Sequence, residues 1–142
     1  MKKRIKTVLT SLGFLAAFLL LVAASSENGS NQNGNKWIAP AFAKSIKNPL
    51  KGDKSSVKLG KELYVQQCAT CHGESGTGNG PSARFLEKHP RNFTEKEFKS
   101  QADGEIFWKI TTGNPPMPSF KGMLTKEQRW QLVNYIRTFS KK

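Results

Sequence analysis

Small and hydrophobic side chains recur with helical spacing in the middle of the chain. Within residues 55–68, Gly60, Tyr64 and Cys68 lie four positions apart. This spacing places them on one face of a helix. The sequence therefore predicts a helix that runs directly into the segment containing Cys68.

Two further helical segments follow. Residues 103–112 show helical periodicity, and Gly113 is a typical residue to end a helix. Thr125 and Gln128 form a capping box that predicts the start of the last helix. The broad apolar face of that helix contains Trp130, Leu132, Val133, Tyr135, Ile136 and Phe139. Because no alternating pattern typical of strands lies between these segments, we predict an all-α domain with three main helices.

The first 26 residues have the pattern of an export signal. A basic start precedes an apolar run at residues 8–24, which ends in small residues. This run is longer than in most cleaved signals and shorter than a comfortable membrane span of about 20 residues. Cleavage after Ala24 and retention as a membrane anchor therefore both stay open. In either case we expect an extracytoplasmic domain, in the bacterial periplasm or anchored to the inner membrane by residues 8–24.

Residues 27–56 show no helical period. Residues 27–35 are polar and contain two Asn-Gly steps, which is typical of a flexible linker. The following residues contain two prolines and are expected to form a loosely packed lead-in. The folded domain is therefore expected to begin near Val57 and to span residues 57–142.

The chain is strongly basic. Its formal net charge is +13, and it remains +9 when the four cations of the first six residues are left out. Lysines are scattered and interleaved with acidic residues, which is typical of a solvated surface. The alternative is that they steer the domain toward an acidic partner or a membrane surface.

The two cysteines of the chain, Cys68 and Cys71, stand directly before His72 in the motif Cys-x-x-Cys-His. A structural zinc site usually takes four ligands, and His89 is the only other histidine. A redox disulfide of the thioredoxin type is expected after a strand rather than after a helix. Cys-x-x-Cys-His is the attachment signature of c-type haem, because two thiols one helical turn apart can reach both vinyl groups of the porphyrin. We therefore predict one covalently bound haem c.

A six-coordinate iron needs a second axial ligand, for which there are three candidates. Met117 lies in the segment TTGNPPMPSF, whose prolines restrict the backbone of the loop. Met123 has no such frame and is expected to fill the core, as methionine usually does. His89 is expected to be an exposed loop residue. Met117 is therefore the predicted distal ligand.

Residues 57–142 resemble the small class I c-type cytochromes of the single-haem bacterial kind. The resemblance is carried by six segments in the order typical of that family, GKELYVQQCATCHG, GTGNGP, PRNFT, DGEIFWKI, MPSF and RWQLVNYIR. It implies a fold of three main helices and loops wrapped around one haem. It also implies thioether bonds at Cys68 and Cys71, proximal ligation by His72 and distal ligation by Met117.

The resemblance extends to neighbours of the haem and to one helix crossing. It implies that Gly60 and Tyr64 cross the last helix at Leu132 and Tyr135.

Three further residues are expected around the haem on the same basis. Pro81 would offer its carbonyl to the free ring nitrogen of His72. Arg91 and Trp108 would donate to the haem propionates, although an exposed cation and a core aromatic are the simpler alternatives for these two residues.

Filled axial positions leave no open site for a substrate, and His/Met ligation raises the reduction potential. We therefore expect one-electron transfer in a respiratory chain rather than catalysis, between redox proteins with acidic docking surfaces and without a nucleic-acid partner. Two alternatives stay open. The chain could be a membrane-tethered haem subunit of a larger respiratory or dehydrogenase complex, or a gas-binding haem sensor or small peroxidase with a labile distal ligand.

Overall fold

The computed structural model describes residues 36–140 of the chain. Residues from Trp37 onward belong to one compact unit. The expected export signal or anchor and the expected linker at residues 27–35 lie outside the described residues. In the part of the chain that is described, no helix has the length and apolar character needed to cross a membrane.

The described residues are helical, which confirms the all-α prediction. In chain order, the elements are η1 (Ala41–Ser45), α1 (Lys54–Gln67), α2 (Ala69–His72), η2 (Ala83–Phe85), α3 (Lys96–Lys99), α4 (Asp103–Thr112) and α5 (Lys126–Phe139). No strand forms between residues 36 and 140, where an isolated bridge joins Asn114 to Met117.

The three long helices coincide with the three predicted segments. Asp53 caps α1 with its carboxylate, which accepts a hydrogen bond from the Ser55 amide at 2.8 Å. Gly113 ends α4 with a positive φ of 66°. The predicted capping box at Thr125 and Gln128 forms at the start of α5, with hydrogen bonds of 3.1 and 2.9 Å.

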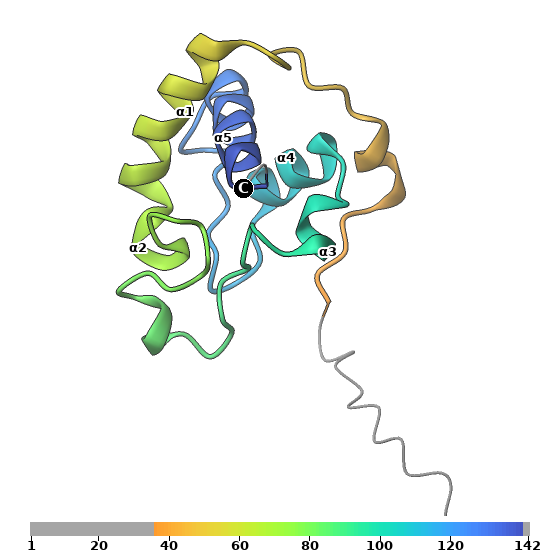
Figure 1. The fold of residues 1–142 in the computed structure, drawn as a ribbon. Coiled ribbons are helices and arrows are strands. Elements are labelled where there is room, and N and C mark those ends of the chain that lie inside the picture. Colours follow the sequence, from red (N-terminus) through yellow and green to blue (C-terminus); the bar gives the residue numbers. More distant parts are fainter. Residues whose placement is uncertain (1–35, 141–142) are drawn as a thin grey trace, which may run out of the picture. The chain divides into compact units, whose positions relative to one another are not determined.

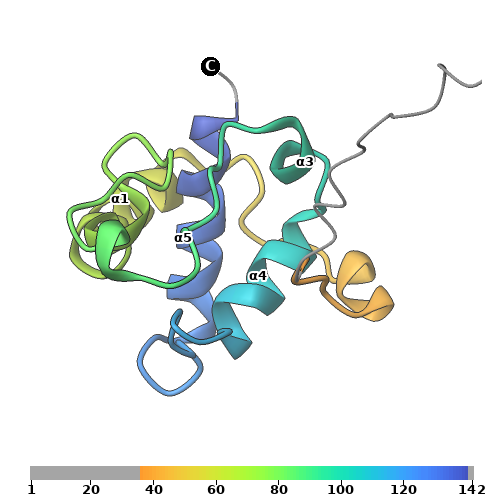
Figure 2. The same ribbon diagram turned by 90° about the horizontal axis from the view of Figure 1, so that it is seen from below.

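The main packing contact of the fold is the crossing of α1 and α5, and α5 lies between α1 and α4 (Figure 1, Figure 2). A side chain at Gly60 would collide with the backbone carbonyl of Gln131 and approach the Tyr135 Cβ to 3.0 Å. Tyr64 lies one turn further along α1 and is fully buried, with its ring 5.2 Å from that of Tyr135. The implied crossing is confirmed at Tyr135, while the backbone nearest to Gly60 is that of Gln131 rather than Leu132. The close approach depends on the absence of a side chain at Gly60.

A cluster of buried apolar side chains, here called the core, fills the space beside this crossing. Its members are Tyr64, Phe93, Phe98, Ile106, Phe107, Ile110, Phe120, Leu124, Trp130, Leu132, Val133, Ile136 and Phe139. Aromatic rings dominate it, and those of Phe107 and Trp130 stack with their centroids 3.9 Å apart. Large rings give a short chain much apolar area to bury.

The lead-in before α1 differs from the expectation of loose packing. The compact unit begins at Trp37, well before Val57. Ala43 is fully buried, and the absence of a side chain at Gly104 of α4 lets the backbone carbonyls of the lead-in approach that helix closely. Asn48 donates to Asp103 at 3.0 Å and to Asn134 of α5 at 2.7 Å. Specific polar contacts thus hold a segment that has no hydrophobic period.

Candidate functional site

The cysteine motif forms a single helical turn at the end of α1. Cys68 follows the last residue of α1, and its carbonyl accepts hydrogen bonds from the amides of Cys71 at 3.2 Å and His72 at 2.9 Å. Both thiols are free and half-buried. The two sulfur-bearing residues and the imidazole therefore lie on one turn, as the spacing predicts.

The surroundings of the thiols oppose the two rival uses of the motif. Burial, and secondarily the charge of Cys71, raises the pKa of the Cys68 thiol to about 12. Disulfide exchange requires a thiolate, so the raised pKa opposes that use of the motif. In addition, no three His, Cys, Asp or Glu side chains of residues 36–140 gather as a metal-binding group.

The imidazole of His72 is held on two sides by residues 91–93. Its Nδ1 lies 3.2 Å from the carbonyl oxygen of Arg91, and its ring stacks on that of Phe93 with centroids 4.5 Å apart. Because a carbonyl can only accept, Nδ1 carries the proton in this hydrogen bond and Nε2 is left as the basic nitrogen. Burial lowers the pKa of His72 despite the opposing effect of the Arg91 carbonyl, which favours the neutral ligand form.

The acceptor for Nδ1 is therefore not the one that the resemblance implied. Pro81 is exposed, and the carbonyl beside Nδ1 belongs to Arg91. The loop after α2 brings residues 90–93 to this place. The Phe93 amide donates to the Gly76 carbonyl at 2.7 Å, and a side chain at Gly78, whose φ is +82°, would collide with the Pro90 carbonyl.

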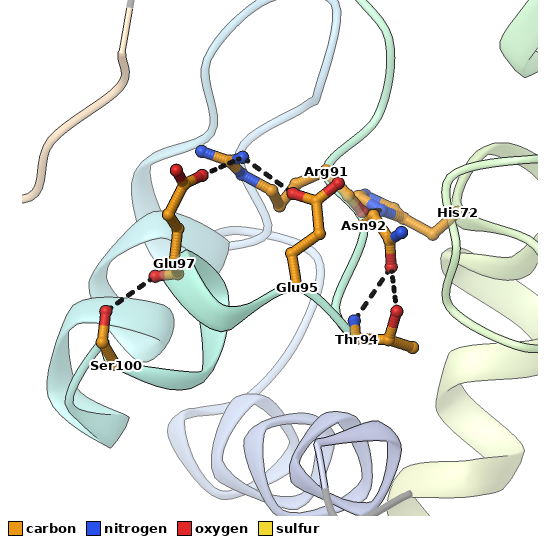
Figure 3. Close-up of polar contacts among 7 residues, drawn as sticks. All are labelled: His72, Arg91, Asn92, Thr94, Glu95, Glu97 and Ser100. Atoms are coloured by element: carbon orange, nitrogen blue, oxygen red, sulfur yellow. Dashed lines mark hydrogen bonds and ion pairs between the residues drawn. The ribbon is translucent and has the colours of Figure 1, made fainter.

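The side chain of Arg91 also differs from its expected role as a propionate donor. Its guanidinium lies 3.2 Å from Glu95 and 3.5 Å from Glu97, in a group that Figure 3 shows beside His72. The guanidinium is thus paired with two carboxylates while the carbonyl of the same residue faces the imidazole.

The turn that carries His72 has a second, buried support. The Tyr64 hydroxyl donates to the Gly73 carbonyl at 2.7 Å, directly after the histidine. Burial raises the pKa of Tyr64, so the hydroxyl stays protonated and can donate. This bond links the helix crossing to the cysteine motif.

Met117 and the two other candidates for the distal position have different environments. Met117 is half-buried against the core, as is Cys68. Its amide and carbonyl pair with those of Asn114 at 2.9 Å each, which closes the loop that contains the prolines. His89 is exposed.

The expectation that Met123 fills the core is wrong. Its side chain is 61% exposed, because the turn before α5 buries Phe120 and Leu124 instead.

Trp108 of α4 and Trp130 of α5 have different surroundings. Trp108 is half-buried against Trp37 of the lead-in, with ring centroids 6.2 Å apart. Trp130 is 1% exposed, and its indole Nε1 finds no hydrogen-bond partner among the described residues. A buried donor without an acceptor is costly, so the Trp130 indole is a position where a bound group could supply an acceptor.

The sequence patterns did not predict the stacking of Phe93 on His72, or that the buried indole of Trp130 lacks a partner among the described residues. Phe93 lies in the segment PRNFT, but its contact with His72 depends on how the loop folds. Trp130 belongs to the periodic face of α5, where it is indistinguishable from any other core residue.

Comparisons with known proteins agree on one kind of domain. A family model described as "Cytochrome C oxidase, cbb3-type, subunit III" matches residues 55–136. The "Cbb3-type cytochrome c oxidase subunit FixP" of Azorhizobium caulinodans is 42% identical over 99 residues, which are 68% of this chain and 32% of that protein. The chain thus spans about a third of the length of this relative.

Two solved structures are similar. A chain of the "Kuenenia stuttgartiensis reducing HAO-like protein complex Kustc0457/Kustc0458" has a TM-score of 0.59 at 31% identity, over 66% of this chain and 49% of that one. The "KustC0563 c-type cytochrome" has a TM-score of 0.50 at 35% identity, over 56% of this chain and 95% of that one.

Proposed function

Because the chain belongs to the family of the cbb3-type cytochrome c oxidase subunit III, we propose that it transfers single electrons through a haem c ligated by His72 and Met117. Family membership and the likeness to the KustC0563 c-type cytochrome confirm the resemblance to class I c-type cytochromes. They also confirm covalently bound haem c and electron transfer as the kind of function.

The observation that carries the ligation is the turn of Cys68, Cys71 and His72. Nδ1 of His72 is engaged by the Arg91 carbonyl, which leaves Nε2 for iron. Cys68 and Cys71 would hold the porphyrin by thioether bonds. When bound, haem c supplies a one-electron Fe(III)/Fe(II) couple.

The residues present fit such a group. Half-buried Cys68 and Met117 both pack against the aromatic core, which would give the porphyrin an apolar environment. The indole N–H of Trp130, which has no hydrogen-bond partner in residues 36–140, could donate to a propionate oxygen, which would remove the cost of burying that donor. Trp130 is therefore our proposed propionate donor, in preference to Arg91, whose guanidinium is paired with Glu95 and Glu97.

Ligation by two protein side chains suits a carrier rather than a catalyst. It leaves no coordination position for a substrate, and thioether sulfur favours the reduced iron. The Asn114–Met117 backbone pair and the prolines between them restrict the loop, which supports Met117 as a ligand that is not readily displaced.

The test is to compare Met117→Ala with the wild type. The ferric wild type should show the weak long-wavelength absorption band typical of iron–thioether ligation, and mass spectrometry should show one haem per chain. Met117→Ala should lose the band, lower the reduction potential and allow carbon monoxide to bind the ferrous iron.

Two variants serve as controls for that experiment. Met123→Ala alters an exposed methionine and His89→Ala an exposed histidine, so both should keep the wild-type spectrum. A wild type that lacks the band and binds carbon monoxide would instead support a gas-binding function. A spectrum altered by His89→Ala but not by Met117→Ala would indicate bis-histidine ligation.

A tethered subunit of a larger respiratory complex is the second candidate function. FixP is by its name a subunit of a cbb3-type oxidase, and the chain spans about a third of its length. We place the domain outside the cytoplasm, in the periplasm, with residues 8–24 as a removable signal or an anchor. N-terminal sequencing of the mature protein distinguishes the two, because a start after Ala24 would exclude tethering by that segment.

The proposed partners are redox proteins with acidic docking surfaces. The charge of +9 outside the first six residues should accelerate association with such a partner at low salt. Electron transfer should therefore slow as salt is added, since exposed charges are screened over about 8–10 Å near physiological ionic strength. A rate independent of salt would mean that the lysines only solvate the surface.

A further inference from the structure

Arg91 makes two contacts that are chemically unrelated. Its carbonyl oxygen lies 3.2 Å from Nδ1 of His72. Its guanidinium lies 3.2 Å from a Glu95 oxygen, four positions further along, and 3.5 Å from a Glu97 oxygen. The side chain thus joins the residue that faces the imidazole to the start of α3, which begins at Lys96.

Other hydrogen bonds close the same short segment. The Asn92 side-chain oxygen accepts from the Thr94 amide at 2.9 Å and from the Thr94 hydroxyl at 2.7 Å. The Ser100 hydroxyl donates to the Glu97 carbonyl at 2.9 Å (Figure 3). Consequently the segment between Arg91 and Ser100 is closed by local bonds, and the ion pairs link Arg91 to the first residues of α3 and its N-cap.

The direction of the Arg91 carbonyl depends on the backbone of this segment. Phe93 anchors it on one side through its bond to Gly76 and through ring contacts with His72 and Phe98, at 4.5 and 4.7 Å. On the other side the anchor is the Arg91 guanidinium on Glu95 and Glu97. Loss of that second anchor would let the peptide unit after Arg91 rotate.

We propose that Arg91 is a positioning residue for the proximal histidine, in which its ion pairs with Glu95 and Glu97 hold its own carbonyl oxygen against Nδ1 of His72. This inference rests on the proposed ligation of iron by His72. A firmly held acceptor at Nδ1 increases the basicity of Nε2 and fixes the plane of the ring. The segment would therefore stabilise the ferric state and lower the reduction potential.

The test compares Arg91→Gln with the wild type in the haem-loaded full chain. The first readout is the solvent exchange of the His72 Nδ1 proton, measured by NMR in the diamagnetic ferrous state. Exposed ion pairs are weak, so we expect exchange to be faster by about two- to tenfold. The second readout is the iron–histidine stretching frequency in a Met117→Ala background, which should fall as the imidazole loses its acceptor.

The reduction potential separates positioning from simple electrostatics. The loss of a positive charge would by itself lower the potential of a haem bound nearby. Losing the acceptor at Nδ1 raises it. A raised potential in Arg91→Gln would therefore indicate the loss of the acceptor, because the lost charge alone acts in the opposite direction.

Three variants complete the design. Arg84→Gln removes another exposed arginine, whose guanidinium lies 4.6 Å from the centre of the Phe85 ring, and should leave both readouts unchanged. Arg91→Lys keeps a cation near Glu95 and should restore most of the slow exchange. Glu95→Gln combined with Glu97→Gln breaks the same pairs without touching Arg91, so it should reproduce the faster exchange and serves if Arg91→Gln fails to fold.

Two results would overturn the positioning role. One is an unchanged exchange rate and stretching frequency in Arg91→Gln, and the other is an equal effect of Arg84→Gln. Neither affects the proposed function, which depends on covalently attached haem and the Met117 absorption band in the wild type.

Discussion

The crossing of α1 and α5 and the loop at residues 73–95 are specified in different ways. At the crossing, Gly60 and Tyr64 of α1 meet Gln131 and Tyr135 of α5 through close packing. In the loop, hydrogen bonds between individual residues hold the backbone, such as the one between the His72 imidazole and the Arg91 carbonyl. Helical periodicity in the sequence predicts the crossing, whereas the loop depends on hydrogen bonds between individual residues that follow no period.

This difference determines how each region should respond to substitution. In the crossing, volume matters, because interiors are close-packed and backbones are in contact. In the loop, single donors and acceptors matter, and many of them are partly exposed to water. Changes in the crossing should therefore affect global stability, while changes in the loop should act on the geometry of His72 at a smaller cost.

The largest effect is expected for Gly60→Ala. Alanine has a higher helix propensity than glycine by about 1 kcal/mol. The added methyl group, however, would collide with the Gln131 carbonyl, and backbone atoms of two packed helices cannot move aside cheaply. We expect a net loss of about 3 kcal/mol in the free energy of unfolding, measured by denaturant titration.

Gly122→Ala is the matched control for this prediction. A side chain at Gly122 would meet nothing within 4 Å, so the change should stay within about 0.5 kcal/mol of the wild type. Equal stabilities of the two variants would mean that α1 and α5 can separate freely, and the contrast between crossing and loop would be lost.

Tyr64→Phe tests the hydrogen bond by which the crossing contacts the start of the loop. The substitution keeps the ring in the crossing but removes the hydroxyl that donates to Gly73 at 2.7 Å. The buried carbonyl is then left without this donor, which should cost about 1 kcal/mol of unfolding free energy. Tyr135→Phe, at a half-buried ring in contact with Tyr64, should cost less. A larger loss in Tyr135→Phe than in Tyr64→Phe would contradict the role given to the bond with Gly73.

The helices could be predicted from the sequence because their determinants are local. A period of four residues, a capping box at Thr125 and a terminal glycine at Gly113 gave the three segments that the structure contains. The turn of Cys68, Cys71 and His72 was equally predictable, since the spacing of the motif matches one helical turn.

The partners of His72 could not be predicted in the same way. Arg91 and Pro81 both lie in the loop after α2, and only the path of the loop through Gly76 and Gly78 decides which carbonyl reaches the ring. Met123 was assigned to the core from residue type alone. Its position in the turn before α5 leaves it exposed, because Phe120 and Leu124 occupy the buried places.

The lead-in before α1 resembles the loop rather than the crossing. Asn48 donates hydrogen bonds of 3.0 Å to Asp103 and 2.7 Å to Asn134, and no periodic pattern in the sequence predicts these bonds. Asp103 also accepts from Arg137 Nε at 2.7 Å. The carboxylate at the start of α4 thereby connects the lead-in to α5. Removing it should show whether the lead-in, like the loop, depends on single polar contacts, each with a small effect on stability.

Asp103→Asn should give the smallest effect of the series and the one that depends on pH. Burial alone would raise the pKa of Asp103, but hydrogen bonds from Asn48 and Arg137 and the charges of Arg137 and Lys51 hold it below its usual value. A lowered pKa in the folded state stabilises the protein above the unfolded-state value of about 3.9, and this contribution is lost as the pH falls through the folded-state pKa. Because the side chains are partly exposed and asparagine keeps one acceptor, we expect a loss below about 1 kcal/mol in the free energy of unfolding at pH 7.

Urea titrations at pH 7, 5 and 3 should show this difference from the wild type shrinking at the lowest pH. The control Glu62→Gln, at an exposed position of α1, should stay within about 0.5 kcal/mol of the wild type at all three pH values. A difference for Asp103→Asn that is the same at all three pH values would mean that the amide disturbs packing, and the contribution of the charged pair would then be negligible.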